Sequence, residues 1–165
     1  MHIPFDKMPD SARLWIYQSD GPMTEKEEEQ IKDYTASFLE EWAAHGAGLN
    51  SSYQILYKQF LIIAVDEAVV SASGCSIDKQ VQFIQAIGDK FSLNFLDRTK
   101  VAFLKQNDHS EPQIILSSLQ EVKGKVAAGE INRETPTFNN LINAKAELDN
   151  NWIVPATDTW LKRYF

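Results

Sequence analysis

The spacing of apolar residues predicts four strands in the first two thirds of the chain. Bulky apolar residues alternate over 12–18 and 53–57, and a continuous apolar run follows over 60–65. Alternation is typical of a half-buried strand, and a continuous run is typical of a strand buried on both faces. The short polar gap between the second and third segments predicts a tight hairpin. Residues 101–104 predict the fourth strand.

Two amphipathic helices are predicted between these strands. Thr24 with Glu27 three positions later is a capping-box signature, and apolar residues then recur at helical spacing until Gly46 ends the pattern. A second helix follows the serine-rich segment 71–76, because apolar residues recur at helical spacing over 81–91.

The order strand, helix, strand, strand, helix, strand predicts a fold of the α+β class. It is the order of the ferredoxin-like βαββαβ arrangement, in which two helices cover one face of a four-stranded antiparallel sheet. We expect this core to span about 10–106, with the first and third strands at its centre. Both of these strands carry apolar residues on both faces, so we expect a further segment to cover the second face.

The C-terminal third, about 107–165, is predicted to be a helical extension that covers that second face. Apolar spacing predicts a helix over 116–126 that closes near Gly129, a loop over 135–137 and another helix over 141–148. The last residues are too apolar to remain in water, and we expect them to dock on the domain. No linker-like stretch separates this third from the rest, so we expect a single domain over 1–165.

Composition and charge narrow the classes of function. The net charge is -7 and no basic patch is present, which argues against nucleic acid as a partner. No apolar segment has the length of a signal peptide or of a membrane span. The single cysteine fits a reducing compartment, so we expect a cytoplasmic protein without membrane insertion. The partner is then a protein, a small ligand or a second copy of this chain.

Candidate chemistry gathers where the run 60–65 ends and the second predicted helix begins. Cys75 lies at that helix start, where backbone amides favour a thiolate, and His45 is the nearest candidate base if both loops lie at one end of the sheet. Asp66 is the candidate third member of a catalytic group. The structural reading is that Cys75 is a buried small residue at a corner turned by Gly74, and that His45 sits in the last turn of the first helix.

Further polar residues border the same corner and are candidate ligand-binding groups: Glu67, Ser73, Ser76 and Asp78, with Arg98 farther along. Asp66, Glu67 and Asp78 would bind a cation if they converged, but consecutive strand residues point to opposite faces. Ser73 or Ser76 is also suited to cap the helix. Arg98 follows Asp97, which indicates an ion pair or turn rather than a phosphate clamp. No spacing predicts a metal site or a cofactor.

Several short segments together resemble a small, uncharacterised bacterial family whose members often carry the label "ABC transporter ATPase". These segments are Pro4-Phe5-Asp6, Trp15-Ile16-Tyr17-Gln18, Trp42-Ala43-Ala44-His45-Gly46, Ala64-Val65-Asp66-Glu67, Ser73-Gly74-Cys75-Ser76-Ile77-Asp78, Asp97-Arg98-Thr99 and Phe138-Asn139-Asn140. The resemblance spans nearly the whole chain. It brings with it no established activity, cofactor or catalytic residue.

The ATPase label fails a physical test on this sequence. A phosphate-binding P-loop needs glycines followed by lysine and then serine or threonine. Gly124-Lys125 is the one Gly-Lys pair, and Val126 follows it. The leading hypothesis is therefore a non-catalytic domain that binds a partner or small ligand near His45, Asp66 and Cys75. The alternative is a thiol- or carboxylate-dependent enzyme at the same corner, and an ATPase is the third reading.

Overall fold

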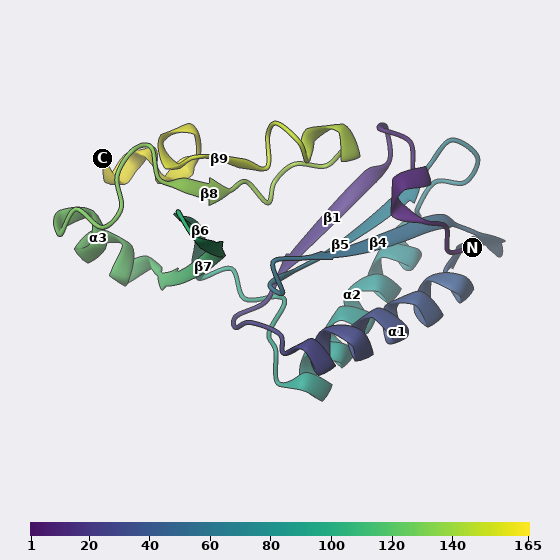
Figure 1. Cartoon of the computed structure of the whole chain (residues 1–165). Coiled ribbons are helices and arrows are strands. Elements are labelled where there is room, and N and C mark those ends of the chain that lie inside the picture. Colours follow the sequence, from purple (N-terminus) through teal and green to yellow (C-terminus); the bar gives the residue numbers. More distant parts are fainter. The chain divides into compact units, whose positions relative to one another are not determined.

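The computed structural model describes all 165 residues and divides them into two compact units (Figure 1). The first unit comprises 1–96 with 143–146, and the second comprises 97–142 with 147–165. The division falls ten residues or so before the predicted end of the core near residue 106. That the whole chain folds as one domain stays a prediction.

The first unit contains a three-stranded antiparallel sheet and two long helices. The strand order is β1-β5-β4, so β5 lies in the middle. The elements are η1 (Phe5–Lys7), β1 (Arg13–Gln18), α1 (Glu25–Glu41), β2 (Ala43–Ala44), β3 (Ala47–Gly48), β4 (Asn50–Leu56), β5 (Phe60–Asp66) and α2 (Gly74–Phe91). The predicted hairpin at Lys58 and Gln59 is confirmed, since β4 and β5 pair from Asn50↔Asp66 to Leu56↔Phe60.

Both helices cover one face of this sheet, as predicted. Residues of α1 and α2 pack against alternate residues of β5 in one buried cluster that includes Ile31, Leu39, Ile84, Ile87, Leu61, Ile63 and Val65. On the opposite face, Phe60, Ile62 and Ala64 are also completely buried. The second face is therefore covered at its central strand, as the apolar pattern requires. That the C-terminal third closes it stays a prediction.

The start of α1 is as predicted, but its end is not. Thr24 and Glu27 form the capping box, with each side chain accepting from the other residue's backbone N–H. The helix then ends at Glu41, because Trp42 takes an extended conformation. His45 and Gly46 turn the small β2–β3 hairpin with positive φ angles of 51° and 80°. The placement of His45 in the last turn of a helix is therefore wrong.

Short segments pair with both outer strands of this sheet. His2 forms a parallel bridge with Ser51 of β4, and Arg13 of β1 forms an antiparallel bridge with Ala144. The N–H of Leu14 donates to the carbonyl of Asn143 at 3.0 Å. These backbone bonds explain why the predicted helix over 141–148 is absent: only the 3-10 turn η2 (Lys145–Glu147) forms there.

The second unit is a four-stranded antiparallel sheet with one α-helix. Its strand order is β7-β6-β8-β9. The elements are β6 (Lys100–Asn107), β7 (Ser110–Ser118), α3 (Leu119–Ala127), β8 (Pro136–Phe138), β9 (Ile153–Pro155), η3 (Ala156–Asp158) and η4 (Trp160–Tyr164). Its core contains Val101, Phe103, Val122, Ile131, Ala156 and Leu161, and Tyr164 and Phe165 pack against it. Leu161, Tyr164 and Phe165 are thus packed against apolar residues, as expected, but within the second unit, and Trp160 stays 47% exposed.

The α+β class is confirmed, whereas the ferredoxin-like arrangement is wrong. The strand predicted as the fourth of that sheet is β6, which pairs with β7 and β8 in the second unit. The C-terminal third is accordingly rich in strands rather than helical. Its helix also starts later than predicted, because β7 continues to Ser118 and a capping box with Glu121 begins α3 there.

Candidate functional site

The two carboxylates at the predicted corner shape the loop that follows β5. Asp66 Oδ1 accepts a hydrogen bond from Ala68 N at 3.0 Å, as in a tight Asx turn. Glu67 Oε2 accepts one from Ala72 N at 2.9 Å, and Glu67 Oε1 lies 3.8 Å from Arg13 Nη1. Both carboxylates are thus engaged with groups of the fold.

The serines of the corner cap α2, which confirms the structural reading made for them. Ser73 Oγ accepts from Ser76 N at 3.2 Å, and Ser76 Oγ accepts from Ser73 N at 2.8 Å. Gly74 is the first residue of α2 and has no positive φ, so it does not turn the corner as that reading proposed. Trp42 Nε1 donates to the carbonyl of Ser76 at 2.8 Å and thereby ties the start of α2 to the residue before β2.

The thiol and the imidazole lie on segments that meet, but they do not contact each other through a hydrogen bond. Cys75 is exposed, so the reading of it as a buried corner residue is wrong. His45 and Asp78 are exposed as well. No hydrogen bond or ion pair joins Cys75 to His45 or Asp66, and the thiol therefore has no bonded base. Their proposed roles as catalytic or ligand-binding groups stay predictions.

Arg98 belongs to the second unit and is exposed. Its neighbour Asp97 makes a turn, as expected: Asp97 Oδ1 accepts from Thr99 Oγ1 at 2.6 Å and from Thr99 N at 2.8 Å. The Thr99 hydroxyl, and then its backbone N–H, lower the pKa of Asp97 below its ordinary value of 3.8.

This shift predicts a small pH dependence of stability. A carboxyl whose pKa is lower in the folded chain stabilises the fold fully above 3.8, and this contribution disappears as the pH falls through the folded pKa. We expect Asp97→Asn to reduce the free energy of unfolding at pH 6 by no more than about 0.5 kcal/mol, since solvent screens this half-buried surface group. Urea unfolding at pH 6 and pH 2.5 measures it, with exposed Asp149→Asn as the control. An equal deficit at both pH values contradicts the prediction.

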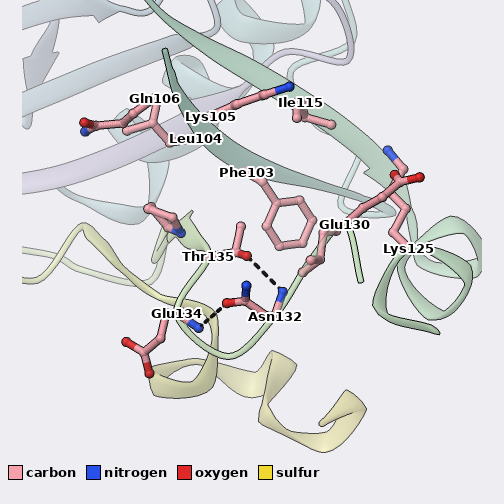
Figure 2. Close-up of a pocket in the computed structure, with 12 residues that line it drawn as sticks. Phe103, Leu104, Lys105, Gln106, Ile115, Lys125, Glu130, Asn132, Glu134 and Thr135 are labelled. Atoms are coloured by element: carbon pink, nitrogen blue, oxygen red, sulfur yellow. Dashed lines mark hydrogen bonds between the residues drawn. The ribbon is translucent and has the colours of Figure 1, made fainter. Parts of the chain in front are cut away.

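A cavity in the second unit is a stronger candidate for a site than the corner. It has a volume of about 560 Å³, which lies within the range of small-molecule sites. Its lining comes from β6 and β7, from the end of α3 and from the segment that leads into β8: Phe103, Leu104, Lys105, Gln106, Ile115, Lys125, Glu130, Ile131, Asn132, Glu134, Thr135 and Pro136. Figure 2 shows the Phe103 ring between β6 and the 132–135 turn.

The base of the cavity is apolar and well packed. Phe103 and Ile131 belong to the core of the second unit and are only 1% and 5% exposed. Ile115, which pairs with Phe103 across β6 and β7, is half-buried, as is Pro136 on the far wall. A ligand in this cavity would therefore rest on aliphatic side chains over a closed aromatic base.

Two lysines supply the positive charge of the cavity. Lys125 is half-buried at the end of α3, and its Nζ donates to Ser117 Oγ at 2.9 Å. Lys105 is exposed on β6. Glu130 and Glu134 also line the cavity, but neither forms an ion pair with a lysine there. In Figure 2 the Glu134 carboxylate is directed away from the Phe103 ring.

The far wall is held in shape by a hydrogen-bonded turn. Asn132 N donates to Thr135 Oγ1 at 2.9 Å, and Glu134 N donates to Asn132 Oδ1 at 2.9 Å (Figure 2). Both bonds lie within the turn itself. The sequence analysis missed this site, because its residues come from separate segments and Lys125 by itself reads as an ordinary helix-end cation.

A second, smaller cavity of about 330 Å³ lies beside the end of α2 in the first unit. Its acidic groups already have protein partners. Asp20 Oδ1 accepts from Asn94 N at 2.8 Å, and Asp89 Oδ1 accepts from Gln85 Nε2 at 3.0 Å. Its carboxylates are therefore less available to a ligand than the lysines of the first cavity.

Comparison with known proteins adds no function. No family model, curated protein or solved structure matches this chain. No helix combines the length and apolar character needed to cross a membrane. No cluster of three or more His, Cys, Asp or Glu side chains is placed to hold a metal ion.

Proposed function

We propose that this protein is a non-catalytic binding domain and that the cavity beside β6 is its binding site. The observation that carries the proposal is the half-buried Lys125 side chain, which lines a cavity with an apolar base and forms no ion pair. The best ligand of such a cavity has an apolar body and one negative charge. This proposal keeps the expected class of function and moves the site away from the corner near Cys75.

The polar corner supports the move. Its carboxylates and serines already accept hydrogen bonds from backbone N–H groups of the same loop and helix. A ligand at this corner would compete with the bonds that shape the loop and cap α2. At Lys125, a ligand would compete with one hydrogen bond, the bond to Ser117.

Two small probes of opposite charge test the proposal. Phenylacetate and phenethylamine share a ring and differ in the charge that they carry. In ¹H–¹⁵N NMR spectra of the full chain, we expect phenylacetate to shift amides around the cavity with saturation in the millimolar range, about −4 kcal/mol. We expect phenethylamine to bind at least about fivefold more weakly.

Variants assign the binding to Lys125. Lys125→Gln should weaken phenylacetate binding about fivefold through loss of the charged partner, whereas Lys123→Gln, on the same helix but outside the cavity, should not. Equal binding of the two probes, or shifts confined to the region of Cys75, would contradict the proposed site.

A further inference from the structure

We propose that the occupant of this cavity is an extended peptide segment carrying an acidic residue, which adds as a strand to the open edge of β6. The inference rests on the proposed binding function and names the class of its ligand. The inference rests on the backbone of β6. On the side away from β7, this strand has no neighbouring strand beyond Phe103.

The pairing of β6 with β8 stops after one position. The register joins Phe103 to Thr137, and β8 begins at Pro136. Thr137 Oγ1 donates to the carbonyl of Ala102 at 2.7 Å, so that carbonyl faces β8. Alternate residues of a strand direct their backbone groups to the same side. The backbone groups of Leu104 and Gln106 therefore also face away from β7 and toward the cavity.

The segment before β8 cannot pair with the Leu104 carbonyl or with the backbone groups of Gln106. Continuing the register places Pro136 opposite Leu104, and proline has no N–H to donate to the Leu104 carbonyl. The next partner, Glu134, donates its N–H to Asn132 Oδ1 instead of to Gln106. The Leu104 carbonyl and both backbone groups of Gln106 are thus directed at the space where another strand would lie.

In the first sheet, by contrast, both outer strands have a paired edge. There, short segments pair with both outer strands, through the bridges His2↔Ser51 and Arg13↔Ala144. In the second sheet, the outer edge of β7 carries Glu111 and Pro112, which are residues that discourage strand addition. Of these edges, the one beside the cavity combines unpaired backbone with space for an added strand, the geometry of β-augmentation.

Lys105, on the strand that would pair with the peptide, favours an acidic residue opposite it. Phe103 and Lys105 lie on the same face of β6, and a residue paired with Lys105 on an added strand would share that face. Lys125 lines the same cavity. An aspartate or glutamate at that position of the peptide would pair with these ammonium groups, and β-branched neighbours would suit the strand conformation.

Backbone methylation tests the proposal. The probe is acetyl-Thr-Val-Glu-Val-Thr-amide, titrated into the ¹⁵N-labelled full chain. Two isomers carry N-methyl groups, one on the second and fourth residues and the other on the third and fifth. Because alternate N–H groups of a strand face opposite sides, we expect one isomer to lose at least about tenfold in affinity while the other stays within about threefold. Equal effects of the two isomers overturn the proposal.

Two further readouts locate and orient the strand. Amide exchange of Gln106 should slow on peptide binding, since its N–H gains an acceptor. Lys105→Glu should weaken binding of the peptide about tenfold, while exposed Lys123→Glu should leave it unchanged. If phenylacetate binds at Lys125 and the peptide does not bind, the proposed function stands and this inference fails. If neither probe binds, both fail.

Discussion

Replacement of Ile63 by alanine is expected to lower the free energy of unfolding by about 2–5 kcal/mol. Ile63 is completely buried at the middle of β5, the central strand of the first sheet, where it pairs with Trp15 and Tyr53. Its side chain faces α1 and α2 within the buried cluster that includes Ile31 and Ile84. Removing three carbons there leaves a cavity that neither helix can fill without moving.

The conservative variant Ile63→Val removes one methyl group and should cost about 0.5–1.5 kcal/mol. Urea unfolding monitored by far-ultraviolet circular dichroism measures both variants. A loss below about 1 kcal/mol for alanine would mean that β5 is not at the centre of a packed core.

The same variant tests whether the two units unfold together. Residues 143–146 belong to the first unit and interrupt the sequence of the second. We therefore expect Ile63→Ala to speed amide exchange at buried positions of both units, including Phe103. Faster exchange confined to 1–96 would contradict the single-domain prediction.

Replacement of Gly88 by alanine is the second large effect. Gly88 lies in the last turns of α2, and an added Cβ would come within 2.6 Å of the carbonyl oxygen of Leu93. That segment cannot easily retreat, because Leu93 N donates to the Gly88 carbonyl at 3.0 Å and Ser92 between them has a left-handed φ of 53°. We expect Gly88→Ala to cost about 1–3 kcal/mol, from displaced backbone.

Gly124→Ala is the matched control, because Gly124 is a helical glycine with open space around it. Alanine there should stabilise the chain by about 0.5–1 kcal/mol through higher helix propensity. The two Gly→Ala substitutions are thus expected to change the free energy of unfolding in opposite directions. Thermal unfolding measures both, and a stabilising effect at Gly88 would contradict the close approach to Leu93.

Elements with strong local signals could be predicted from the sequence. Thr24 and Glu27 begin α1 because both halves of the capping box lie within one turn of chain. The β4–β5 hairpin is equally local, and Tyr57 and Lys58 take the positive φ angles of its turn. In these cases the residues that determine the structure are close neighbours.

The rest of the fold depends on pairing between strands that are distant in the sequence. The apolar pattern identified β6 as a strand, but its sheet is determined by pairing with β7 and β8. β8 and β9 have three residues each, too few for a periodic pattern, and Pro136 there reads as a loop. The helical spacing of Leu116, Leu119 and Val122 predicts that Leu116 is in a helix, although β7 extends beyond it.

The two candidate sites differ in the same way in how far the sequence predicts them. The residues of the polar corner are contiguous in the sequence, and most of them form local hydrogen bonds in the structure. The cavity beside β6 combines strands, a helix end and a turn, and its chemistry lies partly in backbone groups that a sequence pattern does not reveal.

The pairing of residues 143–146 with the start of β1 also affects synthesis of the protein. The Leu14 N–H donates to the carbonyl of Asn143. This edge of the first sheet therefore stays unpaired until residue 143 has left the ribosome. At about 5–20 residues per second, the interval after Leu96 is translated is roughly 2–10 s. A nascent first unit therefore presents an unprotected strand during this time, which makes β1 the expected contact point for a chaperone.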